Sequence, residues 1–266
     1  MNDLKLMTTF ICFFFLIIVS KSFALEEKLL DDDKAFLIRN IIIYDGTGAE
    51  PFTGEIRIKG ERITDVYRGA NISQDINVEI INGQGLALAP GFIDTHSHHD
   101  IGIEQEPIAL AAVTQGITTI IRGVDGFSDP PGSDAYISYD DSYFSMEEFK
   151  NYFNLIPVAI NMVSFSAHNS IRLAVMGEDF KREATTKEIS AMASLIELDM
   201  ESGAYGLSTG LEYDPGIFSS TDEVIQLAKI AAQYNGKYKS HIRSEDRKYW
   251  EAIDEIIDIG RQARIP

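Results

Sequence analysis

Cysteine is almost absent from this chain of 266 residues, and its single copy, Cys12, lies in an apolar N-terminal segment. We expect residues 1–24 to be a secretory signal peptide, with an apolar run over residues 10–19 and a small-x-small cleavage site at residues 22–24. The mature chain would then have no cysteine, which excludes disulfides and cysteine metal ligands. The signal predicts a secreted or periplasmic protein. The alternative is an uncleaved anchor, although a bilayer-spanning helix needs about 20 apolar residues.

Positive charge is also scarce. The chain carries 23 Lys and Arg against 41 Asp and Glu, a formal net charge of −18. Such an acidic surface repels nucleic acid and anionic lipid, so we expect neither nucleic acid nor a membrane as a partner of the mature chain. After the N-terminal segment no run is apolar enough to cross a membrane, and no internal repeat is present. The remaining residues are numerous enough to bury the core of one large domain.

Two patterns of apolar residues follow one another along the chain. Residues 25–89 contain short alternating segments separated by Asp-Gly and Asn-Gly turns, which predicts the N-terminal part of a β-sandwich. From residue 90 onwards strands alternate with helices, which predicts parallel βα units. The expected strands lie near residues 92–97, 117–122, 160–166, 204–208 and 237–242, and the expected helices near residues 186–202, 221–234 and 249–263.

This alternation fits two α/β folds. We predict an incomplete (β/α)₈ TIM-type barrel over residues 90–266, with about five of its eight βα units. A doubly wound sheet would alternate in the same way, but the chain lacks the Gly-x-Gly-x-x-Gly phosphate loop. The chain stops at Ile265-Pro266, where a sixth strand should begin, so we expect a truncated piece of a longer fold.

The first expected barrel strand is followed by histidines, in the segment Pro-Gly-Phe-Ile-Asp-Thr-His-Ser-His of residues 90–98. In an extended strand, residues two apart point to the same side. His96 and His98 can therefore direct two imidazoles at one point, as a metal ion requires. An exposed polar loop is the plain alternative, but three of the five histidines of the chain lie within four positions. His99 has the opposite parity and is expected to point away.

Polar residues also follow the other expected strands, at the edge where the working groups of a (β/α)₈ barrel lie. Asp125 stands between glycines, and it is either a hard oxygen ligand or part of an ordinary Asp-Gly turn. His241 ends the fifth strand and is a candidate third imidazole. His168 is expected to form hydrogen bonds in the pocket wall, as a substrate-binding residue. Gly126 and Gly210 are interpreted as backbone requirements.

Residues 90–98 resemble the strand-one signature of the amidohydrolase superfamily, which contains metal-dependent (β/α)₈ hydrolases with an added β-sandwich. Further stretches narrow the resemblance to the D-aminoacylase, or N-acyl-D-amino-acid deacylase, branch; they are residues 116–126, 174–177, 203–213 and 240–246. The resemblance implies one or two zinc ions and a small-molecule substrate, an N-acyl-D-amino acid. Hydrolysis of its linear amide bond would release a carboxylate and a D-amino acid.

The resemblance also implies the metal ligands. His96 and His98 would bind one zinc site, and His241 would bind the other. Some members of the branch carry a cysteine at the end of the second strand, in a Gly-Asn-Cys-Gly sequence. Asp125 takes that place here, so a carboxylate would replace a soft sulfur ligand.

Two residues are expected to contact the substrate beside His168. Tyr213 matches a position of the branch that contacts the substrate carboxylate. Arg243 is a candidate for a nearby positive charge, because a free carboxylate favours a guanidinium. The alternative for Arg243 is an ion pair with Glu245 or Asp246.

Two parts of the family pattern are expected beyond Pro266: a histidine from strand six and a general-base aspartate from strand eight. If they are missing, the chain would be a non-catalytic fragment, which is the alternative to the deacylase function. The fourth strand reads Leu-Ser-Thr-Gly over residues 207–210, without the lysine that ring-opening relatives carboxylate, which disfavours a hydantoinase-like reaction.

Overall fold

The computed structural model describes residues 35–70, 78–128 and 143–266. The expected signal peptide lies outside these residues. The chain divides into two compact units, Met1–Pro90 and Gly91–Pro266, and each is described by itself.

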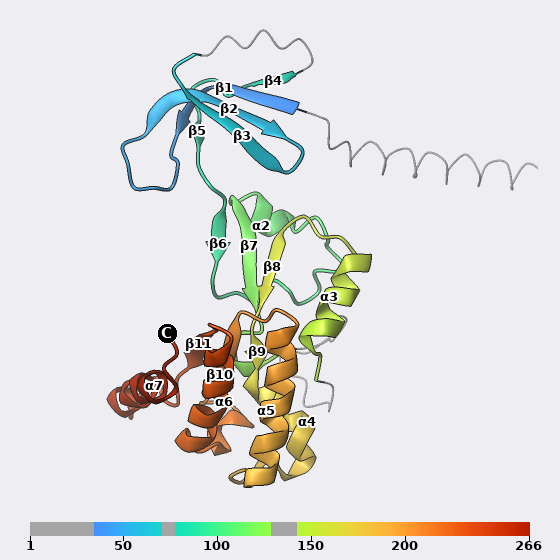
Figure 1. Cartoon of the computed structure of the whole chain (residues 1–266), viewed down its shortest axis with the longest axis vertical. Coiled ribbons are helices and arrows are strands. Elements are labelled where there is room, and N and C mark those ends of the chain that lie inside the picture. Colours follow the sequence, from blue (N-terminus) through green and yellow to red (C-terminus); the bar gives the residue numbers. More distant parts are fainter. Residues whose placement is uncertain (1–34, 71–77, 129–142) are drawn as a thin grey trace, which may run out of the picture. The chain divides into compact units, whose positions relative to one another are not determined.

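The described part of the N-terminal unit is one five-stranded sheet (Figure 1). Its strands are β1 (Ala35–Ile43), β2 (Phe52–Lys59), β3 (Arg62–Arg68), β4 (Glu79–Asn82) and β5 (Ala87–Leu88). The order is β3-β2-β1-β4, and β5 pairs with β1. Strands β2 and β3 pair in antiparallel orientation as a hairpin around residues 60–61. Ile41, Ile43 and Ile56 form its small core. The described strands thus account for a single layer of the expected sandwich.

The C-terminal unit is built on parallel strands, as the alternating pattern predicted. They are β6 (Phe92–Asp94), β7 (Ile117–Arg122), β8 (Asn161–Ser164), β9 (Ser166–Ala167), β10 (Gly206–Gly210) and β11 (Lys237–His241). The pairs run β6-β7-β8 and β9-β10-β11, and every pair is parallel. Only Phe165 separates β8 from β9, so these two form one interrupted strand. The expected five barrel strands are therefore present in the expected order.

Helices connect these strands. They are α2 (Leu110–Val113), α3 (Met146–Leu155), α4 (His168–Met176), α5 (Thr186–Glu201), α6 (Thr221–Gln233) and α7 (Tyr249–Ala263), with 3₁₀ turns η1 (Val124–Gly126), η2 (Gly177–Phe180) and η3 (Gly216–Phe218). The Thr185 hydroxyl caps α5 in a reciprocal pair with Glu188, and the Ser220 hydroxyl caps α6. These caps explain why both helices begin where the sequence predicted.

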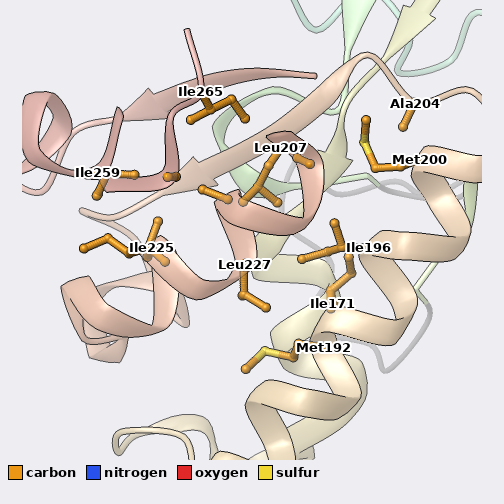
Figure 2. Close-up of a cluster of buried hydrophobic side chains, with 14 of the residues drawn as sticks. Ile171, Met192, Ile196, Met200, Ala204, Leu207, Ile225, Leu227, Ile259 and Ile265 are labelled. Atoms are coloured by element: carbon orange, nitrogen blue, oxygen red, sulfur yellow. The ribbon is translucent and has the colours of Figure 1, made fainter. Parts of the chain in front are cut away.

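The main core of this unit lies between the strands and helices α4 to α7 (Figure 2). Leu207 on β10 is fully buried against side chains of α5 and α6, including Ile196 and Leu227. Ile259 extends the cluster to α7. Because the outward-facing side chains of β10 are covered by helices, its opposite face and its carboxyl end remain for polar groups. Within the described residues, no helix is both long and apolar enough to span a bilayer.

Candidate metal centre

The first candidate ligands lie just beyond β6, which ends at Asp94 and is shorter than the sequence suggested. The backbone N–H of His96 donates to Asp94 Oδ1 at 3.2 Å, which turns the chain directly after the strand. The rings of His96 and His98 then lie edge to face, 5.8 Å apart. Their convergence therefore comes from this turn rather than from strand alternation. His99 contributes a different contact, 3.9 Å from Nε2 to Asp94 Oδ2.

Asp125 is the centre of the cluster. Its Oδ2 lies 3.0 Å from His96 Nε2 and 3.3 Å from His98 Nε2. Its Oδ1 lies 4.0 Å from His241 Nδ1. The candidate ligand atoms of His96, His98 and Asp125 all fall within 4.8 Å of one another. The sequence placed these four residues at the ends of three strands, and the fold brings them together.

One carboxylate oxygen of Asp125 lacks a hydrogen-bond partner, as expected where a cation binds. The carboxylate is buried, and its Oδ1 has no hydrogen-bond partner among the described residues. A buried, unsatisfied carboxylate oxygen is costly unless a partner neutralises it. Imidazole nitrogens and a carboxylate oxygen form a donor set that suits zinc. The residues at this site therefore fit a zinc ion.

The charge state of Asp125 agrees with a ligand role. Burial raises the pKa of Asp125, but the hydrogen bond from His98 and the charge and hydrogen bond of His96 outweigh it. The net pKa lies below the ordinary value, so the carboxyl group is ionised. Metal ligation requires this deprotonated form.

A strained turn holds the Asp125 carboxylate in place. Gly123, Asp125 and Gly126 have positive φ angles of 67°, 54° and 80°. Aspartate tolerates this left-handed conformation better than most residues. Added to Gly126, a Cβ atom would lie 2.3 Å from Asn169 Oδ1, and one on Gly210 would lie 2.1 Å from the Asp125 carbonyl oxygen. The expectation that Gly126 and Gly210 are backbone requirements is confirmed.

Two polar side chains that the sequence did not single out support this turn. The Ser208 hydroxyl accepts the Gly126 N–H at 3.2 Å and donates to the Gly123 carbonyl. The Asn169 amide donates to the Gly210 carbonyl at 2.9 Å and accepts the Gly210 N–H at 3.2 Å. Ordinary polar residues carry no sequence signal for this role, because their partners lie about 40 or more positions away.

His241 is surrounded by polar groups from the segments that follow β10 and β11. The Tyr213 hydroxyl lies 2.8 Å from Nδ1, and Glu212 Oε2 lies 3.1 Å from Nε2. Glu245 Oε1 lies 3.6 Å from the same Nε2. Burial, followed by the charges of nearby carboxylates, raises the pKa of Tyr213, so its hydroxyl keeps its proton. The structure thus places Tyr213 at the candidate centre and adds Glu212, which sequence reasoning missed.

A lysine also reaches this edge. Lys239 lies on β11 two residues before His241, and its ammonium donates to the Thr95 carbonyl. Burial lowers the pKa of Lys239, while the carboxylates of Asp125 and Asp94 act in the opposite direction. The sequence analysis did not consider this residue.

His168 is not where the sequence placed it. Its side chain is fully buried, with Nε2 at 2.9 Å from Glu223 Oε1 and Nδ1 at 3.3 Å from Asn169 Oδ1. Arg172 contacts the same Glu223 oxygen at 2.9 Å. Because both ring nitrogens are engaged and no face is exposed, the expectation that His168 lines the pocket and binds substrate is wrong.

Arg243 is also committed elsewhere. Its Nε lies 2.9 Å from Glu255 Oε2 on α7, and its Nη2 donates to Glu255 Oε1 at 2.9 Å. Nη1 donates to the Ile217 carbonyl at 3.0 Å. The partner is therefore neither Glu245 nor Asp246, as the sequence alternative had it. A bidentate carboxylate therefore already occupies the guanidinium, and the expected contact with a substrate carboxylate stays a prediction.

Known proteins resemble the chain over most of its length, although no family model matches it. It is 32% identical over 250 residues to the N-acyl-D-aspartate deacylase of Alcaligenes xylosoxydans, covering 89% of this chain and 49% of that protein. It is 31% identical over 234 residues to the D-aminoacylase of the same organism, covering 84% and 47%. The chain therefore spans about half the length of the curated relatives it matches.

Solved structures give the same result. A D-aminoacylase whose binuclear metal centre has been examined matches with a TM-score of 0.78 and 29% identity, over 87% of this chain and 50% of that one. The N-acyl-D-glutamate deacylase of Bordetella bronchiseptica, in complex with zinc and a phosphonate mimic of the tetrahedral intermediate, matches with a TM-score of 0.77 and 27% identity, over 88% and 50%. The predicted fold, part of a (β/α)₈ barrel with a β-segment before it, is confirmed.

Proposed function

Because this chain belongs to the D-aminoacylase family of the amidohydrolase superfamily, we propose that it forms the metal-binding half of a zinc-dependent deacylase. The reaction is hydrolysis of the linear amide bond of an N-acyl-D-amino acid, which yields a carboxylate and a D-amino acid. The activity is proposed for a whole protein, since the matched relatives are about twice as long. The observation that supports it most is the approach of two imidazoles to the buried Asp125 carboxylate, with its Oδ1 unsatisfied.

The residues have distinct parts in this proposal. His96, His98, Asp125 and His241 hold one or two zinc ions. Bound zinc supplies a Lewis acid for the amide carbonyl and acidifies water at neutral pH. The Tyr213 hydroxyl, which keeps its proton, donates a hydrogen bond to the substrate carboxylate. The buried position of Asp125 keeps its charge from bulk solvent, which strengthens its attraction for a cation.

We also propose that the protein is exported to the periplasm or secreted. The support is the apolar run at residues 10–19 followed by a small-x-small site at residues 22–24. The substrate is a small N-acyl amino acid, and the acidic composition disfavours nucleic acid and anionic membranes as partners.

Zinc binding tests this proposal first. Full-length chain, stripped with a chelator, is titrated with zinc by calorimetry, alongside the variants His96→Ala and Asp125→Asn. Each variant should bind zinc about 100-fold more weakly, since each removes a direct ligand. His99→Ala is the matched control, because His99 lies in the same segment and does not contact Asp125 in the described contacts.

Activity is tested on the whole protein to which it is assigned, with N-acetyl-D-glutamate, N-acetyl-D-aspartate and their L-enantiomers, by the release of free amine. Zinc-dependent release from the D-compounds alone is the expected result. Equal zinc affinity of the native chain and the variants His96→Ala, Asp125→Asn and His99→Ala would contradict the proposal. Faster release of amine from the L-compounds than from the D-compounds would also contradict it.

A further inference from the structure

A cavity of about 680 Å³ adjoins the candidate metal centre at His98. It lies between the loop that follows β6 and helix α2, and small-molecule sites commonly have this volume. Most of its lining is apolar, and the apolar residues are Ile101, Ile103, Ala109, Leu110, Ala111 and Ala112. The proposed zinc site uses His98 and none of these residues, so the cavity is distinct from the ligand set but shares one wall with it.

The floor of the cavity is packed, whereas its rim is exposed. Ile103 and Ala112 belong to a buried cluster with Ile120 of β7, and they are only 3% and 2% exposed. Ile101 and Leu110 are 40% and 61% exposed. Apolar surface gains free energy when another apolar group removes it from water. The cavity is therefore a preformed receptor for a hydrocarbon group, with a base that the core holds in place.

The order of groups along the centre determines which end of the substrate reaches the cavity. The hydroxyl of Tyr213, proposed to bind the substrate carboxylate, lies 2.8 Å from His241 Nδ1. The same nitrogen lies 4.0 Å from Asp125 Oδ1, and Asp125 Oδ2 lies 3.3 Å from His98 Nε2. The cavity follows on from His98. A substrate with its carboxylate at Tyr213 and its amide carbonyl at the ligand set thus directs its acyl chain toward the cavity.

The polar groups on the lining limit the charge of that chain. Besides His98 they are His99, Glu106 and Thr114. His99 Nε2 lies 3.9 Å from Asp94 Oδ2, and Glu106 is exposed. A carboxylate at the end of the acyl chain would meet Glu106 and no cation, because neither lysine nor arginine occurs among the described residues that line the cavity. The lining therefore favours an uncharged chain.

We propose that this cavity receives the acyl chain of the substrate, and that the protein prefers N-acyl-D-amino acids whose acyl chain is uncharged, apolar and longer than acetyl. This inference rests on the proposed function and adds the acyl part of the substrate and the residues that select it. Each methylene that enters the cavity should tighten binding about fourfold. The lining residues determine specificity, since they contact the chain and not the amide bond that is hydrolysed.

Two substitutions on α2 separate the cavity from the rest of the helix. Ala111 lines the cavity and is exposed, so Ala111→Phe places a ring in the space that a long chain would occupy. Val113 is 42% exposed on the same helix and is not part of the lining, so Val113→Phe is the matched control. Leu110→Asn makes the rim polar without filling the cavity, and it decides alone if Ala111→Phe does not fold.

The experiment measures binding by the full chain, with and without zinc, of D-glutamate carrying an acetyl, butanoyl, hexanoyl, octanoyl or hexanedioyl group. Calorimetry gives the affinities, and circular dichroism checks folding. In the native chain and Val113→Phe, affinity should rise about fourfold per methylene from acetyl to octanoyl, also without zinc, and hexanedioyl should bind more weakly than hexanoyl. Ala111→Phe should lose the gain for the long chains, and Leu110→Asn should reduce it. The ratio kcat/KM of the whole protein should follow the same order.

Three results would overturn the inference. The first is an affinity that does not rise with chain length, including the absence of binding. The second is an equal response of Ala111→Phe and Val113→Phe, and the third is hexanedioyl binding as tight as that of hexanoyl. The proposed function could survive each of them, since zinc binding and release of amine from the acetyl compound are measured separately. Loss of both would overturn the proposed function, and this inference with it.

Discussion

In the described part of the C-terminal unit, two buried carboxylates face histidine, and they differ in what neutralises them. Asp125 Oδ2 lies 3.0 Å from His96 Nε2, and Glu223 Oε1 lies 2.9 Å from His168 Nε2. In each carboxylate the other oxygen has no hydrogen-bond partner among the described residues. Judged by burial and histidine contact alone, the two sites are alike.

Arg172 separates them. Its Nε lies 2.9 Å from the Glu223 oxygen that also contacts His168, and the whole group is buried. Around Asp125 the contacting groups are imidazoles, and the His96 and His98 side chains are 48% and 30% exposed. A carboxylate paired with a buried guanidinium is a completed structural contact, whereas one facing partly exposed imidazoles is an open ligand set. The permanent positive charge of Arg172 therefore distinguishes the Glu223 site from the Asp125 site, whereas burial of the carboxylate does not.

The largest effect is expected when the buried Glu223–Arg172 ion pair is broken. Arg172→Met should lower the free energy of unfolding by about 3–5 kcal/mol, because it leaves Glu223 charged, buried and without a permanent cation. It also removes the N–H groups that bond the carbonyls of Phe180 and Arg182 at 2.6 Å each. Urea denaturation measures the change.

Arg182→Met provides the contrast, because its ion pairs with Asp179 and Glu188 are partly exposed. It should cost about 1 kcal/mol or less. Zinc affinity should be unchanged in every Arg172→Met sample that remains folded. A similar loss of stability in the two variants would contradict the distinction between the buried and exposed pairs.

A smaller effect is expected from a substitution beside His241, at the open ligand set. Glu212 Oε2 lies 3.1 Å from His241 Nε2, on the side of the ring away from the Nδ1 that faces Asp125. A carboxylate in this position orients a metal-binding imidazole and makes it more basic. Glu212→Gln should therefore weaken zinc binding about tenfold, the lower end of the range for such outer partners.

Calorimetry with zinc measures this loss, and Glu245→Gln is the control. Glu245 approaches the same nitrogen at 3.6 Å and is more exposed, so its removal should matter less. Equal effects of the two substitutions would mean that general negative charge, rather than orientation of His241, sets the affinity.

Several features of this unit could be predicted from the sequence, because local signals or a rule of the fold determine them. The order of the parallel strands and the starts of α5 and α6 followed from periodicity and capping residues, which are local signals. The convergence of His96 and Asp125 followed from a rule of the fold, that functional groups lie at the carboxyl ends of barrel strands.

The same rule misplaced His168, because it locates a residue at the correct edge without naming its partner. That partner, Glu223, is 55 positions further along the chain, on α6. The ion-pair partners suggested for Arg243, Glu245 and Asp246, were wrong for a similar reason, since Glu255 reaches it from α7. Ser208 and Asn169 were missed because supporting a turn requires only a hydrogen-bonding side chain at the correct place in space, and no residue type marks it.

The smallest expected effect is on the stability of the fold at acidic pH. Burial raises the pKa of Glu223, but hydrogen bonds and charges from His168 and Arg172 outweigh it, so its pKa in the folded chain lies below the ordinary 4.5. A carboxyl group with a lowered pKa in the folded state stabilises the fold above its unfolded pKa, and that contribution is lost as pH falls through the folded pKa. The loss begins near the ordinary value of 4.5 and continues below it.

Comparison with Glu223→Gln isolates this contribution from those of other carboxylates. The free energy of unfolding is measured in urea at about pH 6 and about pH 3.5, and the native chain should lose more of it than the variant, by less than about 1.4 kcal/mol per pH unit. If Glu223→Gln kept the native pH dependence, the Glu223–Arg172 pair would not be the permanently charged contact that distinguishes it from Asp125.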